Sequence, residues 1–128
     1  MKFIIVGLLL VSTSACERET TPTPTNTEIA ESGSLPSGYS RVEDTSQVCM
    51  VTNQYMGRAQ IPVAVENRTY YGCCPMCKDR LNNEPSTRTA LDPVTGENVD
   101  KASAVIVKAA DGSLLYFANE RTLSQFRG

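Results

Sequence analysis

The feature that most constrains this chain is a cluster of cysteines. Residues 70–77 read YYGCCPMC and contain three of the five cysteines, and the chain has no histidine. Sulfur atoms this close together can be joined in disulfides, take part in thiol–disulfide exchange or bind a metal ion. Aromatic residues make up only 6% of the chain and there is no tryptophan. A core so poor in large side chains would gain stability from a covalent or metal cross-link.

The N-terminus has the pattern of an export signal. Lys2 is followed by nine apolar residues at positions 3–11 and then by small residues up to Ala15. This stretch is too short for a transmembrane helix, which needs about 20 apolar residues. We therefore predict a signal peptide over residues 1–15.

The predicted cleavage point is similar to that of bacterial lipoproteins. Ser14 and Ala15 stand directly before Cys16, although Thr13 replaces the Leu that is usual in that family. The resemblance implies that Cys16 is lipidated. It also implies an exported protein that is anchored to a membrane of the bacterial cell envelope. The alternative is an ordinary signal peptide that leaves Cys16 as a free thiol.

Residues 16–45 are rich in Thr, Pro, Ser and Glu and have almost nothing to bury. Such a composition predicts a disordered tether. A tether of this length would let a folded domain stand clear of a membrane surface.

The remaining residues predict a small α+β fold made of two ββα units. In the first unit, residues 61–65 and 69–71 read as two strands joined by a tight loop at residues 66–68. Residues 74–81 then read as a short helix, with Pro75 in its first turn. In the second unit, residues 104–107 and 114–117 read as strands, and Asn119 as the cap of a final helix.

Aligned with each other, the two units differ in their cysteines. Three cysteines of the first unit each face a residue without sulfur in the second: Cys49, Cys73 and Cys77 face Thr95, Ala118 and Thr122. A site that is present in one copy and lost in the other explains this difference better than three independent losses of core cysteines. We therefore predict a cysteine-bearing unit over residues 46–90 and a unit without cysteines over residues 91–128.

A cysteine, a hairpin and then C-x3-C at the start of a short helix resemble the TRASH domain. Cys49, Cys73 and Cys77 fit this pattern, and the second unit is similar to the related YHS domain, with Thr95 in place of its usual cysteine. The resemblance implies treble-clef-like units that handle metals, with the site confined to the first copy.

Thiolates favour soft metal ions, so the chemistry points to Zn²⁺ or Cu(I). Cys49, Cys73 and Cys77 are the expected ligands, and Cys74 is an alternate or fourth ligand. Met50 and Met76 lie beside these cysteines and offer thioether sulfur, although packing in the core is the commoner role of methionine.

Two other uses of the cysteines stay open. Cys74-Pro75-Met76-Cys77 is a C-x-x-C motif at a strand-to-helix turn, which is where a thioredoxin-like redox pair lies. Such a fold requires a βαβ framework, whereas the sequence predicts a hairpin before the motif. Alternatively, the four cysteines that follow Cys16 could form two structural disulfides after export.

Charge and residue content exclude other functions. The net charge of -2 and the pI of about 5.1 provide no basic surface for a nucleic acid. No histidine, paired carboxylate or serine motif supplies a general base near the cysteines, so we do not expect an enzyme. The sequence therefore predicts an envelope lipoprotein that captures, buffers or hands over a soft metal ion.

Overall fold

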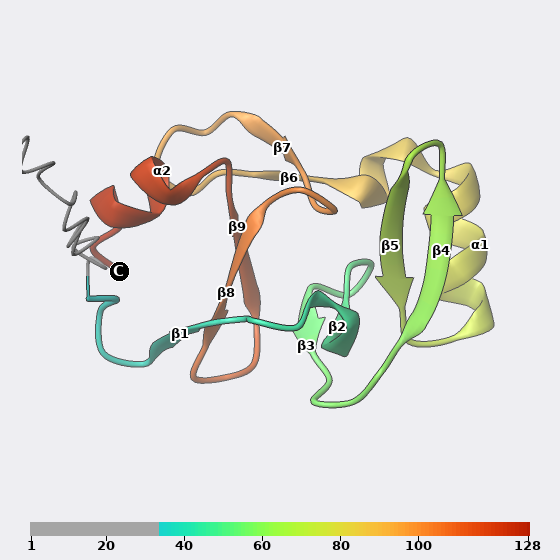
Figure 1. Ribbon diagram of the computed structural model, residues 1–128, viewed down its shortest axis with the longest axis horizontal. Coiled ribbons are helices and arrows are strands. Elements are labelled where there is room, and N and C mark those ends of the chain that lie inside the picture. Colours follow the sequence, from blue (N-terminus) through green and yellow to red (C-terminus); the bar gives the residue numbers. More distant parts are fainter. Residues whose placement is uncertain (1–33) are drawn as a thin grey trace, which may run out of the picture.

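The computed structural model describes residues 34–128. Its architecture is mixed α+β, as the sequence predicts, with several small antiparallel sheets and two α-helices (Figure 1). The predicted signal peptide, the predicted lipid attachment at Cys16 and residues 17–33 of the predicted tether lie outside the described residues. No helix within residues 34–128 is long and apolar enough to span a bilayer.

The two halves of the domain have the same order of elements: a short pair of strands, a hairpin and a helix. The first half consists of β2 (Val48–Cys49), β3 (Gln54–Tyr55), β4 (Ile61–Val65), β5 (Arg68–Gly72) and α1 (Pro75–Asn83). The second half consists of β6 (Thr89–Leu91), β7 (Asn98–Asp100), β8 (Val105–Ala109), β9 (Leu114–Phe117) and α2 (Glu120–Gln125). In addition, β1 (Tyr39–Arg41) and the 3-10 helix η1 (Thr45–Gln47) precede the first half, and the 3-10 helix η2 (Pro85–Arg88) precedes β6.

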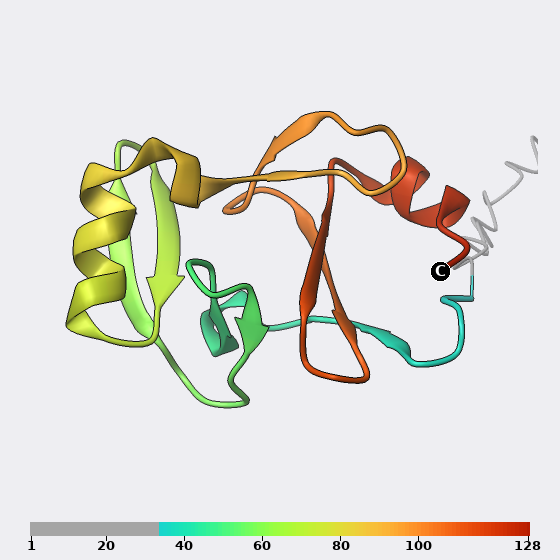
Figure 2. The same ribbon diagram turned by 180° about the vertical axis from the view of Figure 1, so that it is seen from behind.

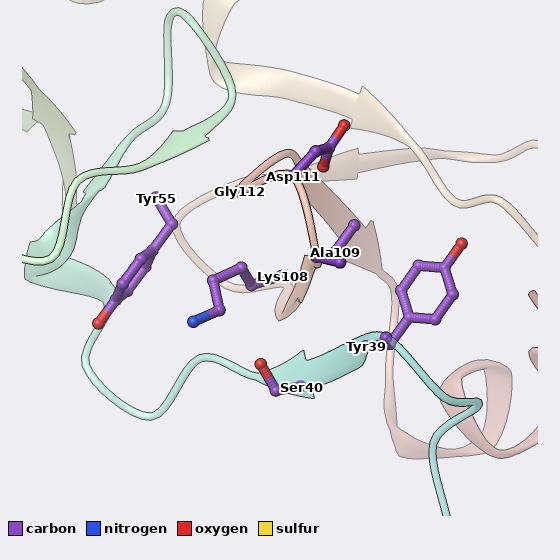
Figure 3. A pocket seen from close by; sticks show the side chains of 9 residues that line it. Tyr39, Ser40, Tyr55, Lys108, Ala109, Asp111 and Gly112 are labelled. Atoms are coloured by element: carbon purple, nitrogen blue, oxygen red, sulfur yellow. The ribbon is translucent and has the colours of Figure 1, made fainter.

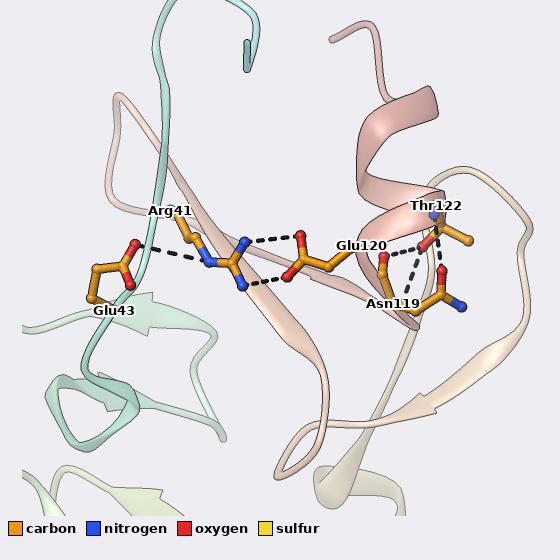
Figure 4. Close-up of polar contacts among 5 residues, drawn as sticks. All are labelled: Arg41, Glu43, Asn119, Glu120 and Thr122. Carbon is orange, nitrogen blue, oxygen red and sulfur yellow. Dashed lines mark hydrogen bonds and ion pairs between the residues drawn. The ribbon is translucent and has the colours of Figure 1, made fainter. Parts of the chain in front are cut away.

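The predicted hairpins and helices are present, with small shifts at their ends. In the first half, Val65 pairs with Arg68, so the β4–β5 loop contains two residues instead of the predicted three. Strand β9 has the predicted bounds, whereas β8 lies slightly further along the chain than residues 104–107. The side chain of Asn119 caps α2 by accepting a hydrogen bond from the Thr122 N–H, as Figure 4 shows.

The folded part begins within the segment that was predicted to be a disordered tether. Residues 39–41 form β1, which pairs antiparallel with β8 and completes a sheet of order β1-β8-β9. The Tyr39 ring meets the ring of Phe126 edge-on, with centroids 5.0 Å apart. Arg41 forms a two-pronged ion pair with Glu120 at the start of α2 (Figure 4). Because residues 16–45 are polar as a group, their composition gave no sign that residues 39–41 pack against the second half.

The two halves share one hydrophobic core. Strands β8 and β9 lie between the β4–β5 hairpin and α2, and the β2–β3 pair lies between the two hairpins (Figures 1 and 2). Because side chains alternate along a strand, one face of β8–β9 packs against the first half and the other against α2. The shared core includes Val48, Met50, Val63, Tyr70, Leu81, Ile106, Leu114 and Tyr116, and a smaller cluster contains Val107, Phe117 and Leu123.

A polar contact also joins the halves beside the first hairpin. The Tyr70 hydroxyl donates to the Asp100 carboxylate at 2.8 Å, and Arg68 forms an ion pair with the same carboxylate. Since Asp100 ends β7, this contact fixes β5 of the first half against the second half. The strand that leads to the cysteine cluster is therefore positioned from both halves.

We expect that Tyr39→Ala destabilises the domain by about 1–2 kcal/mol, because it removes the edge-on contact with Phe126 and the apolar area around it. Urea denaturation of the purified protein measures the loss. Ser40→Ala, at the exposed neighbouring position of β1, is the matched control and should leave the stability nearly unchanged. Equal stability of the two variants would show that β1 does not belong to the folded unit.

Candidate metal centre

Three cysteine sulfurs converge beside α1, as the sequence predicts. The Sγ atoms of Cys49, Cys73 and Cys77 all lie within 4.8 Å of one another. Cys77 is 3.9 Å from Cys49 and 3.6 Å from Cys73, measured between the sulfurs. Since a Zn–S bond is about 2.3 Å long, two ligands of a tetrahedral site lie about 3.8 Å apart. The spacing of the three sulfurs therefore fits a common metal ion.

Cys49 is held in place by the loop that follows it. The residue ends β2 opposite Gln54, and the next N–H, that of Met50, donates to the Tyr71 carbonyl at 2.9 Å. This hydrogen bond ties the loop to β5, close to Cys73. The Cys49 side chain is fully buried at 0% exposure. Its sulfur is thus the innermost of the cluster and is fixed by backbone contacts on two sides.

Hydrogen-bond donors surround the Cys49 sulfur. Burial by itself raises the pKa of this thiol, because it disfavours the charged form. The side chain and N–H of Thr52, together with the N–H groups of Cys73 and Val51, outweigh burial and lower the pKa of Cys49 to about 7. The pocket is therefore suited to an anionic sulfur, which is the form that binds a metal.

The second half has the same arrangement around a carboxylate. Asp92 is 1% exposed, and one of its oxygens accepts from the N–H groups of Val94 at 2.8 Å and Thr95 at 3.3 Å. The other oxygen accepts from the Ala118 N–H at 2.8 Å. Val94 and Thr95 stand two and three residues after Asp92, and Ala118 lies just before α2. The N–H donors to Cys49 have the same positions in the first half: two lie two and three residues after it, and one lies just before α1. We call this arrangement of three backbone N–H groups the anion seat.

The structure therefore corrects the predicted match between Cys49 and Thr95. Four residues separate Cys49 from its pairing partner Gln54, and four separate Asp92 from Glu97, whose carbonyl accepts from the Asp92 N–H. The last loop residue has a positive φ in both halves, 55° at Asn53 and 71° at Gly96. Asp92 is thus the counterpart of Cys49, and Thr95 belongs to the loop. The Asp92 carboxylate also reaches the end of the second hairpin, where it accepts from the Ala118 N–H.

Cys73 and Cys77 are brought together where β5 meets α1. Gly72 ends the strand, and a Cβ atom at this position would lie only 2.9 Å from the Cβ of Cys77. Real Cβ contacts are not that short, so the close approach of strand and helix requires glycine here. Cys77 is the third residue of α1 and is buried, whereas Cys73 is half-buried in the connection.

The other thiols differ from Cys49 in their pKa values. Burial, and then contacts with the neighbouring sulfurs, raise the pKa of Cys77 to about 12. Burial also raises the pKa of Cys73. At Cys74, the nearby N–H and sulfur of Cys77 lower the pKa. A metal that binds at this site must therefore displace protons from Cys73 and Cys77, so its affinity rises with pH.

A buried lysine from the second half braces the loop of the anion seat. Lys101 is 4% exposed, and its ammonium donates to the Met50 carbonyl at 2.6 Å and to the Asn53 side chain at 2.8 Å. Burial lowers the pKa of Lys101 to about 8, and the nearby Cys49 opposes this shift. Three thiolates around a divalent ion would leave one negative charge, which the Lys101 ammonium would help to offset.

The remaining sulfur atoms lie around this group. Cys74 is outside the set of three, although its Sγ is 3.4 Å from that of Cys77. Met50 is buried in the core, whereas Met76 is 71% exposed and does not pack. Cys49, Cys73, Cys74 and Cys77 are all free thiols in this structure, which joins none of the described cysteines in a disulfide.

A separate hollow lies along β1 and the β8–β9 turn and contains no cysteine (Figure 3). Tyr39, Ser40, Tyr55 and Lys108 line it together with the turn at Asp111. The Lys108 ammonium lies 4.4 Å from the centre of the Tyr55 ring and is engaged there in a cation–π contact. We assign no ligand to this hollow.

Sequence reasoning found the three cysteines but missed the groups that hold them. The sequence signals for these groups were too weak to use. Asp92 stands in an Asp-Pro pair that is common in turns, Lys101 is one of many charged residues, and Gly72 is a single glycine before a cysteine pair. No protein family, no curated protein and no solved structure matches the chain.

The anion seat of the second half should make stability depend on pH. Burial opposes ionisation of Asp92, but hydrogen bonds from the N–H groups of Ala118, Val94 and Thr95 and from the Thr122 side chain outweigh it, so folding lowers the pKa of Asp92 below 3.8. The stability contributed by the ionised carboxylate is therefore present above about pH 4 and is lost as the pH falls below that value. Asp92→Asn should cost about 1–3 kcal/mol at neutral pH, where a charged acceptor is replaced by a neutral one.

Urea denaturation of both proteins between pH 2.5 and pH 7 checks this prediction. The difference between them should shrink as the pH falls, which separates Asp92 from the other carboxylates. A difference that stays constant over this range would contradict the role of the charge.

Proposed function

We propose that this protein binds a soft transition metal ion, Zn²⁺ or Cu(I), through Cys49, Cys73 and Cys77, and that it captures, buffers or hands over that ion. The observation that carries the proposal is the convergence of the three sulfurs within 4.8 Å of one another. The donor set supports a soft ion, since thiolates bind Zn²⁺ and Cu(I) in preference to Ca²⁺ or Mg²⁺. The anion seat at Cys49 adds support, because it favours one ligand in its metal-binding form.

The resemblance to TRASH and YHS domains is consistent with this proposal. Those domains are associated with metal handling, and their cysteine pattern corresponds to Cys49, Cys73 and Cys77. In our proposal the second half retains the fold with Asp92 in the anion seat. The halves would thus have divided two tasks, metal binding in the first and support of the loop in the second.

Metal content of the full chain, purified without oxygen, tests the proposal directly. We expect about one equivalent of Zn²⁺ or Cu(I) per chain, as a site of three thiolates takes one ion. Cys49→Ser should weaken binding by about 100-fold, which corresponds to about 2.7 kcal/mol. Competition with a chromophoric chelator measures the affinity of each protein.

Cys49→Asp is the matched control for folding. It places in the first half the residue that fills the anion seat of the second, so the variant should fold like the parent protein. An oxygen ligand suits Cu(I) poorly, so Cu(I) binding should still be lost. Absence of metal in the parent protein, together with absence of free thiols and unfolding on reduction, would show that the cysteines form disulfides instead.

A thiol–disulfide function is the second candidate, and one observation favours it. The sulfurs of Cys74 and Cys77 are 3.4 Å apart, and the more exposed thiol, Cys74, has the lowered pKa. Against it, all strand pairs of residues 34–128 are antiparallel, whereas a thioredoxin-like pair requires a βαβ framework. Reductase activity that survives Cys49→Ser but not Cys77→Ser would support this candidate.

We further propose that Cys16 carries a lipid that anchors the protein to a membrane of the cell envelope. The support is the similarity of residues 13–16 to a lipoprotein signal. In a bacterial host, the parent protein should appear in the membrane fraction and incorporate labelled palmitate, whereas Cys16→Ser should do neither. Membrane association of the Cys16→Ser variant would argue against the lipid.

A further inference from the structure

Cys74 occupies a distinct place among the sulfurs. It lies 3.4 Å from Cys77, yet it is not among the three cysteines that lie within 4.8 Å of one another. Cys77 therefore has neighbours on two sides: Cys49 on the buried side, and Cys74 on the side of the helix start. A metal ion bound to Cys77 could reach either neighbour with a small movement.

The sulfur atoms form a series from the core to the surface. Cys49 is fully buried and Cys77 is 6% exposed, whereas Cys73 and Cys74 are half-buried. Met76, one residue before Cys77, is 71% exposed at the start of α1. On the far side of Cys73, an open hollow is lined by residues 58–62. The site is therefore closed at Cys49 and open at the connection between β5 and α1.

The matching helix of the second half indicates that Cys74 is not there to cap α1. Asn119 holds the same position in α2, and its side chain accepts a hydrogen bond from the Thr122 N–H at 3.1 Å. Cys74 makes no capping hydrogen bond in α1. Asparagine is among the best N-cap residues, and cysteine is not among those preferred there. At this position the first half therefore has the thiol of Cys74, whereas the second half has the stabilising N-cap Asn119.

We propose that Cys74 is the exchange ligand of the site: it takes the metal ion over from Cys49 and presents it, with Cys73 and Cys77, to an acceptor that has thiolate ligands. This inference rests on the proposed metal-binding function and adds the direction in which the ion leaves. The bond from the metal to Cys49 breaks as the bond to Cys74 forms; Cys49 stays a thiolate in the anion seat, and the proton of Cys74 is released to water. The metal keeps its charge, and no electron is transferred.

The chemistry of the surface indicates what kind of acceptor fits. Sulfur is presented near the opening as two half-buried thiols and an exposed thioether, beside the hollow lined by residues 58–62. An acceptor with soft ligands can replace these sulfurs one at a time, so the ion never needs to be released to water. A partner protein with an exposed cysteine pair satisfies this requirement.

The test compares the affinity for the metal with the rate of its transfer. The full chain is loaded with Zn²⁺ or with Cu(I), and excess 4-(2-pyridylazo)resorcinol or bathocuproine disulfonate then removes the ion in a stopped-flow instrument. Equilibrium competition with the same chelators gives the affinity. Cys74→Asn is the main variant, because it copies the cap of α2 and should keep or improve the stability of α1.

We expect Cys74→Asn to bind one equivalent of metal with an affinity within about threefold of the parent protein and to release it about tenfold more slowly. Met76→Leu, which keeps the size of the exposed side chain, serves as a control for access to the opening. Its release rate should fall by less than that of Cys74→Asn.

Other outcomes overturn the inference in different ways. Loss of affinity in Cys74→Asn as large as in Cys49→Ser would identify Cys74 as a fixed fourth ligand. Unchanged affinity and an unchanged release rate would show that Cys74 has no part in exchange. Absence of metal binding by the parent protein would instead overturn the proposed function itself.

Discussion

The arrangement on which most of this structure depends is the anion seat. In each half, three backbone N–H groups converge on one side chain at the end of the first strand, Cys49 in one half and Asp92 in the other. Buried N–H groups without a partner are costly, so an acceptor is needed at this position in both halves. In the second half a carboxylate meets this need, and the fold requires no metal there. In the first half a sulfur does so, and as a thiolate it can also bind a metal.

The same arrangement explains why the first half does not build its site alone. Two of the N–H donors to Cys49 belong to the loop at residues 50–53, and Lys101 of the second half holds that loop. The third donor follows β5, which Asp100 of the second half fixes through Tyr70. The halves also share most of their buried side chains. The second half, although without cysteines, therefore determines the geometry of the cysteines in the first.

Local patterns in the sequence were sufficient for the hairpins, the helices and the convergence of the three cysteines. The hairpins and helices depend on residues that are close in the chain, such as Pro75 in the first turn of α1 and Asn119 before α2, whereas the convergence was predicted from the spacing pattern of cysteines up to 28 residues apart. What could not be predicted depends on distant contacts. Nothing near Lys101 indicates that its partner is the carbonyl of Met50, and nothing near Tyr39 indicates Phe126. The match of Cys49 with Thr95 was wrong for a related reason: the loops have equal length but unlike sequences, and only the hydrogen bonds identify Asp92.

A metal site built in this way, as we propose it, would separate tight binding from release. The N–H donors at Cys49 are fixed by the fold, so little ordering remains to be done when a metal binds, and preorganisation of this kind favours affinity. Cys73 and Cys74 instead lie in a short connection at the surface, where ligands can be replaced one at a time. If all the ligands were as enclosed as Cys49, the ion would leave only when the core opened. In the proposed site, one ligand in the anion seat and the others at the start of a helix would let a domain this small hold an ion firmly and still give it up.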